Sequence, residues 1–243
     1  MGIDHTGVVE EYSRSFTEAV EGNLGAPVPT CPGWTVADLV AHLAEVQSWW
    51  TLVVLAKGAL PDDEAARRAA DTGPDLVEGW REISARYVAV QREYPSDGPA
   101  WAWWNDASRD TAAGVAWRQA HEAVVHCWDA WRAAGAVRAI PADLAADGVD
   151  EFLTRFLHGE EWAGGRATVD LTATDTGATW RVGAGGAAKP ARLAVSDVPA
   201  DGVVTGTAEQ LYLLLWRRIG VEEVVVTGDA TKVDAVLQWP NLT

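Results

Sequence analysis

Apolar residues recur every three or four positions along four long stretches in the first part of the chain, residues 6–20, 35–54, 75–92 and 107–134. This spacing places the apolar side chains of each stretch on one face of an α-helix. In the second stretch that face is formed by Leu39, Leu43, Val46 and Trp50. Four amphipathic helices joined by loops bury their apolar faces most economically against one another. The pattern therefore predicts an N-terminal four-helix bundle.

After Pro141 the pattern changes to short alternating stretches separated by glycine-rich turns. Alternation predicts strands at residues 167–173, 179–182, 191–195, 202–204 and 223–226. Helical spacing predicts helices at residues 150–157, 207–218 and 229–237. The stretch Gly183 to Gly186 lacks the strand-turn-helix context of a phosphate loop and is interpreted as a turn. We expect two domains, a bundle at residues 1–143 and a small α+β domain at residues 144–243.

Three residues on two of the predicted helices have the chemistry of a metal site. Glu122 and His126 are four positions apart, so both side chains leave the same face of one helix. His42 lies on the apolar side of the helix at residues 35–54 and is expected to point inward. Two imidazoles and a carboxylate suit a divalent ion and leave a coordination position open. The alternative is a chance spacing, with His42 a hydrogen-bonded core residue.

His121 does not complete a zinc-protease motif, because the residue four positions later is Val125. It is rotated by roughly 100° from Glu122 around the helix, so we expect it to flank the ligands rather than to join them. A metallopeptidase is therefore disfavoured.

The charge of the chain restricts its partners. It carries 19 Lys and Arg against 35 Asp and Glu, a formal net charge of −16, and we expect neither nucleic acid nor anionic membranes as partners. There are two cysteines, Cys31 and Cys127, and their spacing predicts no disulfide framework, so a reducing, cytoplasmic location is expected. The N-terminal stretch predicts an amphipathic helix and neither a signal peptide nor a membrane span. Small-molecule substrates, including anionic ones, remain possible.

The chain holds 14 tryptophans, and three of them lie close together at Trp101, Trp103 and Trp104. Their rings could close one end of the bundle, or they could form the wall of a pocket beside the metal. The sequence leaves both alternatives open.

Several motifs together resemble the mycothiol-dependent maleylpyruvate isomerase family. They are the stretch from Cys31 to Leu43, the tryptophan-rich loop, the segment from Trp117 to Ala130, and the tail segments 206–208 and 214–218. The resemblance implies a DinB-like four-helix bundle that binds a divalent metal ion, usually zinc, followed by a sterol-carrier-like α+β domain. By motif match the metal ligands are His42, Glu122 and His126.

The resemblance also implies a catalytic arginine in the second domain. It falls on Arg218 if the family's Trp-Gly-Arg pattern matches Trp216-Arg217-Arg218, although here the middle glycine is replaced. Arg217 and Arg218 therefore both remain candidates.

The function implied is that of a metal- and mycothiol-dependent enzyme. One possibility is cis-trans isomerisation of an unsaturated acid by thiolate addition and elimination, and another is thiol S-transfer to electrophiles. An isomerase needs a cation to bind carboxylates, which Arg118 or Arg218 could supply. Neither cysteine is well placed as a nucleophile, so the thiol is expected to be an external low-molecular-weight cosubstrate. The alternative is a non-enzymatic metal or small-molecule binding protein of the same fold.

Overall fold

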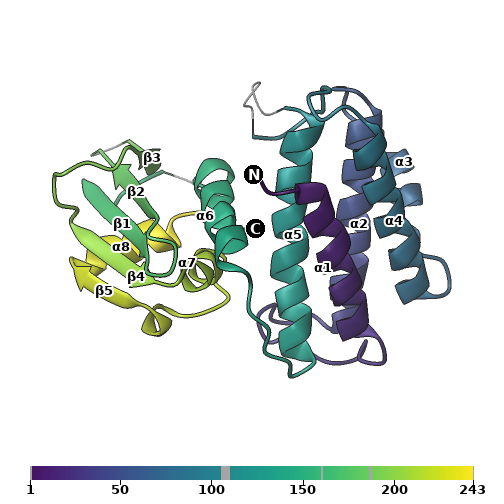
Figure 1. Ribbon diagram of the computed structural model, residues 1–243, viewed down its shortest axis with the longest axis horizontal. Coiled ribbons are helices and arrows are strands. Elements are labelled where there is room, and N and C mark those ends of the chain that lie inside the picture. Colours follow the sequence, from purple (N-terminus) through teal and green to yellow (C-terminus); the bar gives the residue numbers. More distant parts are fainter. Residues whose placement is uncertain (1, 105–109, 160, 186–187, 243) are drawn as a thin grey trace. The chain divides into compact units, whose positions relative to one another are not determined.

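The computed structural model describes residues 2–104, 110–159, 161–185 and 188–242, drawn as ribbon in Figure 1. The chain forms two compact units, residues 1–138 and 139–243. The boundary predicted after residue 143 lies slightly further along, inside the first turn of helix α6 (Ala142–Arg155). Eight α-helices and a sheet of five strands are found within the described residues.

The first unit is a four-helix bundle, as its sequence predicts. Its long helices are α1 (His5–Val20), α2 (Val36–Leu55), α4 (Leu76–Glu93) and α5 (Ala112–Ala133). Helix α1 packs against α5 and α4, and α2 packs against α4 and α5, so each helix has two neighbours (Figure 1). The predicted start of the fourth helix, Ala107, lies outside the described residues, and α5 begins at Ala112 after the cap Thr111.

A short fifth helix, α3 (Asp63–Ala69), packs along the outer side of α2 (Figure 1). The sequence pattern misses it because none of its seven residues is buried, so it has no apolar face. Its N-terminus is capped by Asp62, whose side chain accepts a hydrogen bond from the Ala65 amide at 2.9 Å. The hydroxyl of Ser48 on α2 donates to the carbonyl oxygen of Ala69 at 2.8 Å and holds the other end.

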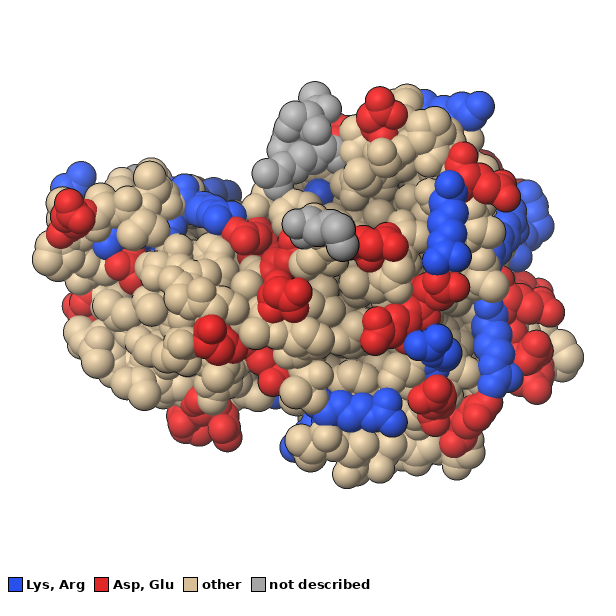
Figure 2. Space-filling model, viewed as in Figure 1, with Lys and Arg blue, Asp and Glu red and all other residues tan. Residues whose placement is uncertain are grey.

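The bundle core is dense in aromatic rings. Trp80 is completely buried, packs edge-on against Phe16 with ring centroids 5.3 Å apart, and donates its indole N–H to Thr17 at 3.0 Å. Replacing such a ring with alanine typically costs about 3–5 kcal/mol. Acidic and basic side chains are intermingled on the surface of the helical unit in Figure 2. Among them, Arg81 of α4 pairs with Glu21 at the end of α1.

The tryptophan-rich segment packs onto this core. The rings of Trp101 and Trp49 lie 6.4 Å apart, and Trp104 stacks on Trp50 at 5.6 Å. Trp101, Trp103 and Trp104 are half-buried against the hydrophobic cluster that contains Trp50. Of the two alternatives left by the sequence, the structure favours the one in which these rings close the bundle.

The second unit is an α+β fold around a mixed sheet. Its strands are β1 (Ala167–Ala173), β2 (Thr179–Ala184), β3 (Ala191–Leu193), β4 (Gly202–Gly206) and β5 (Val225–Gly228). Their order is β3-β2-β1-β4-β5, in which β1 and β4 are parallel and the other pairs antiparallel. Alternate residues of β1, such as Val169 and Leu171, are buried. Helices α7 (Ala208–Leu215) and α8 (Ala230–Gln238) pack against β1 and β4.

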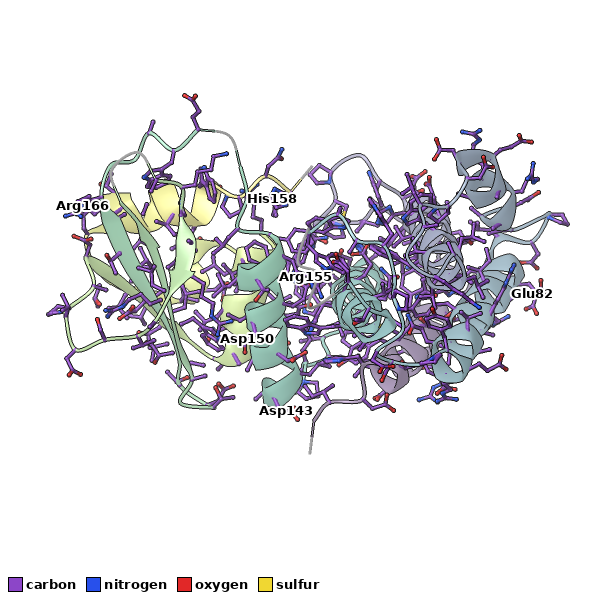
Figure 3. All side chains as sticks on the ribbon, turned by 90° about the horizontal axis from the view of Figure 1, so that it is seen from above. Glu82, Asp143, Asp150, Arg155, His158 and Arg166 are labelled. Atoms are coloured by element: carbon purple, nitrogen blue, oxygen red, sulfur yellow. The ribbon has the colours of Figure 1, made fainter. Side chains whose placement is uncertain are left out.

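Helix α6 (Ala142–Arg155) is longer than the predicted helix at residues 150–157. The pattern misses its first turns because they are rich in alanine and contain Gly148. This glycine permits a close approach of α7, since a Cβ there would lie 2.4 Å from the Tyr212 ring. Asp150, labelled on α6 in Figure 3, accepts a hydrogen bond from the Trp180 indole at 3.0 Å and so joins the helix to β2.

Two smaller predictions also need correction. Gly183 and Ala184 belong to β2, so the predicted glycine-rich turn is in part a strand, while Gly186 lies outside the described residues. Strand β5 begins at Val225, after a 3₁₀ turn at Val221–Glu223 that the pattern assigned in part to the strand. Among the described residues, no helix combines the length and apolar character needed to cross a membrane.

Candidate metal centre

Helices α2 and α5 bring His42, Glu122 and His126 together. The Oε1 atom of Glu122 lies 3.1 Å from Nε2 of His42 and 3.4 Å from Nε2 of His126. Each of the three residues offers one possible ligand atom, and these three atoms all lie within 4.8 Å of one another. The side chains of Glu122 and His126 are 13% and 11% exposed, whereas that of His42 is 31% exposed. The cluster is thus buried on its α5 side and accessible at His42.

These separations suit a small divalent ion. Zinc binds imidazole nitrogen and carboxylate oxygen at about 2.0–2.1 Å, and two such ligand atoms at a tetrahedral centre lie about 3.3 Å apart. The two distances to Glu122 Oε1, 3.1 and 3.4 Å, match that edge. Two nitrogen ligands and one oxygen ligand leave a fourth position for a substrate atom. The residue types and the spacing both fit a catalytic metal site.

Arg118 holds the carboxylate of Glu122 from behind. It is 5% exposed, lies one turn earlier on α5, and forms an ion pair with Glu122 Oε2. Burial by itself raises the pKa of Glu122, but the Arg118 charge, together with His126 and His42, outweighs burial and holds this pKa well below its usual value. Glu122 is therefore ionised. Arg118 was one of two arginines expected to bind substrate carboxylates. This expectation needs correction, because its guanidinium is buried against Glu122.

Asp129 orients the second imidazole. The Nδ1–H of His126 donates to Asp129 Oδ2 at 2.9 Å, which leaves Nε2 directed toward Glu122. Asp129 is fully buried and is itself held by the hydroxyl of Thr30, which donates to Oδ1 at 2.5 Å, and by the thiol of Cys31 at 3.7 Å. Burial lowers the pKa of His126, but the carboxylates of Asp129 and Glu122 outweigh it and raise this pKa to about 9.

Asp129, Thr30 and the position of Cys31 were not identified from the sequence. The sequence did contain one signal for Asp129. It lies three positions after His126, so both side chains are on the same face of the helix and the carboxylate can reach Nδ1 of the imidazole. The proximity of residues 30 and 31 to α5 depends on tertiary packing, and no local pattern reports it. Cys31 consequently lies nearer the centre than the sequence analysis assumed.

His42 forms the accessible side of the cluster. Its ring lies edge-on to His126 at 5.0 Å and edge-on to Trp34 at 5.1 Å. Beyond it opens a cavity of about 480 Å³ between α2 and α3, which His42 and Trp49 help to line. A molecule in this cavity therefore has direct access to a candidate ligand.

His121 lies apart from this cluster. It is completely buried, and its ring faces His5 of α1 at a centroid distance of 6.3 Å. The expectation that His121 flanks the metal ligands is corrected accordingly. Its rotation around α5 turns it toward α1, whereas Glu122 and His126 face α2.

The two candidate arginines of the second unit differ in their environment. After α7 the chain turns back in a Schellman motif, in which the Arg218 amide donates to Leu213 and the Arg217 amide to Leu214. Arg217 adopts a φ of 57°, the left-handed conformation that glycine accepts readily, which accounts for the glycine in the family pattern. Its guanidinium donates to the carbonyl oxygens of Gln238 and Pro240 at 3.0 and 2.7 Å and holds the C-terminal segment.

Arg218 is half-buried and donates to the carbonyl oxygen of Trp216 at 2.9 Å. Because Arg217 serves a structural purpose, Arg218 is the better candidate for a chemical role. That role stays a prediction.

Comparison with known proteins gives a consistent result along the chain. Residues 8–131 match the family model of the mycothiol maleylpyruvate isomerase N-terminal domain, and residues 143–235 match that of the MDMPI C-terminal domain. A crystal structure of mycothiol-dependent maleylpyruvate isomerase is similar with a TM-score of 0.66 at 17% identity, and one of a mutant of that isomerase with 0.65 at 15%. Each comparison covers 94% of both chains. No curated protein sequence matches this chain.

Proposed function

The chain belongs to the mycothiol maleylpyruvate isomerase family, and from that premise we propose that it is a metal- and mycothiol-dependent enzyme that adds the thiol to an electrophilic carbon of a small substrate. The observation that carries the proposal is the convergence of His42, Glu122 and His126 on one point beside a cavity. We propose these three residues as the ligands of a divalent ion, most simply zinc. When bound, such an ion supplies a Lewis acid that lowers the pKa of a coordinated thiol.

The remaining residues of the centre prepare the ligands. Arg118 keeps Glu122 ionised and fixes Oε2, so that Oε1 faces the two imidazoles. Asp129 accepts a hydrogen bond from Nδ1–H of His126, which directs Nε2, the nitrogen that would bind the metal, toward Glu122. These contacts fix the ligand geometry before a substrate arrives, which is the condition for efficient catalysis at such a centre.

Neither of the two cysteines of the chain is a suitable nucleophile. Cys127 is completely buried, and burial raises the pKa of its thiol to about 12, so it stays protonated and unreactive at neutral pH. The thiol of Cys31 is directed to the carboxylate of Asp129 at 3.7 Å. An external low-molecular-weight thiol is therefore the proposed nucleophile.

For a cis-unsaturated acid, the proposed reaction begins when the sulfur adds to one carbon of the conjugated double bond and a proton adds to the other. The former double bond then rotates freely as a single bond. Loss of the same proton and thiol restores the double bond as the trans isomer, with no net change in atoms or electrons. With an electrophile that carries a leaving group, the sulfur would instead stay attached, and the enzyme would be an S-transferase.

One observation favours the S-transferase as a second candidate. Arg118 is committed to Glu122, so it is not available to bind the carboxylates of an unsaturated diacid. An isomerase would need the cation from elsewhere, and we propose Arg218 as its source. The identity of the product distinguishes the two activities.

The test is to incubate the zinc-loaded protein with mycothiol and maleylpyruvate, and to identify the product by chromatography and mass spectrometry. Formation of the trans isomer only when thiol is present supports the isomerase. A stable thioether formed with a monofunctional electrophile, and no isomer, supports the transferase. Full metal occupancy without thiol-dependent conversion of any substrate would instead indicate a binding protein. Thiol-independent turnover that disappears in Cys31→Ser would place the nucleophile in the chain.

A further inference from the structure

The cavity beside His42 has a composition that differs from that of a dicarboxylate site. It lies between α2 and α3, is open to solvent on one side, and has a volume of about 480 Å³, within the usual range for small-molecule sites. Trp49, Trp50 and Val46 of α2 and Ala66 of α3 supply its apolar wall. Trp50 is buried, but the half-buried indole of Trp49 offers a flat surface for the C–H face of a ligand.

Three charged side chains complete the lining, Glu45 from α2 and Asp63 and Arg67 from α3. Within the part of the chain that the structure describes, none of the three has a hydrogen bond or an ion pair. Their neighbours on α3 are paired, since Arg68 binds Glu64. The cavity therefore presents two carboxylate acceptors and one guanidinium donor that can all be used by a ligand.

The balance of charge selects the kind of ligand. Carboxylates outnumber cations in the lining, in a chain whose formal net charge is −16. A dianion would be repelled by Glu45 and Asp63 more than it is attracted by Arg67. Hydroxyl groups, in contrast, donate charge-assisted hydrogen bonds to carboxylates and accept them from guanidinium. Aromatic walls together with carboxylates and an arginine suit an uncharged, hydroxyl-rich ring.

A second groove, between α1 and α4, differs from the cavity at His42 in the pairing of its charged side chains. It is of similar volume, about 450 Å³, but its rim is closed by ion pairs, among them Arg81 with Glu21 and Arg92 with Glu10. Four of its charged side chains are thus paired with one another, and none of the three candidate ligands lines it. The cavity at His42, in contrast, combines charged side chains that are unpaired within the described residues with a candidate metal ligand in its lining.

We propose that the cavity between α2 and α3 binds the hydroxyl-rich sugar portion of the thiol cosubstrate, and thereby places its sulfur at the side of the centre formed by His42. This inference rests on the proposed function, since it assigns one end of the thiol to the cavity and the other to the metal. Trp49 stacks on a sugar ring, while Glu45, Asp63 and Arg67 bind hydroxyls. The electrophile then approaches from outside this cavity.

Helix α3 is the element that determines this selectivity. It contributes Asp63 and Arg67 at positions four residues apart, so both face α2. The Asp62 cap and the hydrogen bond from Ser48 to Ala69 fix its two ends. The cavity thus depends on a short helix that the hydrophobic pattern does not reveal.

The direct test is a titration of the zinc-loaded protein by isothermal titration calorimetry with glucosaminyl-inositol whose amine is acetylated, which is the uncharged sugar portion of mycothiol without its cysteine. Binding is expected, and Glu45→Gln with Asp63→Asn should weaken it by about tenfold through loss of charge-assisted hydrogen bonds. Arg68→Ala is the matched control, because Arg68 is the next residue on α3 but pairs with Glu64, and it should leave binding unchanged.

A kinetic test uses two thiols. The KM for mycothiol should rise about tenfold in the double variant and in Trp49→Leu, whereas the KM for N-acetylcysteine, which lacks the sugar, should not change. Absence of binding of the acetylated glucosaminyl-inositol to the wild-type protein would overturn the proposal. Tighter binding of maleate to the double variant, with an unchanged KM for mycothiol, would overturn it in favour of a dicarboxylate in the cavity.

Failure of this inference is separable from failure of the proposed function. The titration contains no thiol and needs no turnover. Binding of the glycoside without any thiol-dependent reaction would contradict the catalytic proposal alone. Thiol-dependent turnover without glycoside binding would contradict only the assignment of the cavity.

Discussion

Two buried clusters of charged side chains, one in each unit, have opposite organisation. In the sheet, Arg181 forms a two-pronged pair with Asp170 at 2.6 and 2.7 Å, and its third nitrogen donates to Ser196 at 2.7 Å. In the bundle, His42 and His126 both turn an Nε2 atom toward a single oxygen of Glu122. The first cluster satisfies its own donors and acceptors. The second directs two imidazole nitrogens and one carboxylate oxygen at one point, an arrangement that could hold a cation.

The difference shows how a structural ion pair can be distinguished from a binding site of similar composition. Asp170 and Arg181 face each other directly across β1 and β2, so the pairing follows from strand register. Glu122 also has an arginine partner, but Arg118 occupies only Oε2 and leaves Oε1 for the imidazoles. A carboxylate that is fixed at one oxygen and presents the other oxygen to two imidazoles has the geometry expected of a metal ligand.

The largest effect on metal binding is expected from removing the two imidazoles whose Nε2 atoms face Glu122. The double variant His42→Ala, His126→Ala should lower zinc affinity by more than about 10³-fold, since even partners outside the first coordination layer contribute about 10–100-fold. Metal content measured by elemental analysis after purification without chelator checks this. Asp170→Asn is the comparison variant, and it should keep full metal content while lowering the Tm by a few degrees. Full metal in the double variant would show that the bundle cluster is not the site.

The two arginines that follow α7 allow the same comparison between a structural and a chemical role, here for a positively charged side chain. Arg218→Ala should lower turnover by roughly 10²-fold, the effect expected from losing a charge-assisted contact made in the transition state. Arg217→Gly should leave turnover unchanged, because Arg217 is bound to two backbone carbonyls and glycine relieves its left-handed conformation. Steady-state kinetics on both variants, with metal content measured, decide the matter. Equal rates in Arg218→Ala and wild type would confine the chemistry to the bundle.

Substitution of Asp129 should lower zinc affinity less than loss of the two histidines does. Asp129→Asn keeps the shape of the side chain but no longer stabilises the Nδ1–H tautomer of His126, so zinc affinity should fall by about 10–100-fold. A competition titration with a chromogenic chelator measures this. Retained affinity would mean that His126 binds metal without help from Asp129.

The two clusters should differ in how protein stability and zinc binding depend on pH. The pKa of His126 is raised from 6.5 to about 9, so in protein treated with a chelator its protonated form stabilises the fold below pH 6.5, and this contribution is lost as the pH rises to 9. Zinc requires the neutral ring, so apparent zinc affinity should fall about tenfold per pH unit below 9.

The gain in Tm on adding zinc should therefore grow between pH 6.5 and 9 and disappear toward pH 5. Thermal melts with zinc or chelator across this range provide the measurement. A gain that does not vary with pH would show that no histidine proton is displaced. Asp170→Asn should leave the profile unaltered, because the sheet cluster contains no histidine.

The sequence by itself determined the four long helices, the change to a small α+β domain, and the candidate ligands. Each depends on residues close in sequence or on a repeated spacing, as with Glu122 and His126 one turn apart on α5. The long apolar faces of α2 and α5 also fix which sides of these helices are buried. For these elements, local periodicity and burial specify the same structure.

Tertiary structure alone decided which polar groups meet. The contact of Thr30 and Cys31 with Asp129 joins residues almost a hundred positions apart, and the commitment of Arg118 to Glu122 rather than to a substrate depends on burial. Helix α3 has no buried residue, so its place on α2 follows from a cap and one hydrogen bond rather than from an apolar face. Hydrophobic spacing reports which face of an element is buried, whereas the partner of each polar atom is fixed only when distant segments pack together.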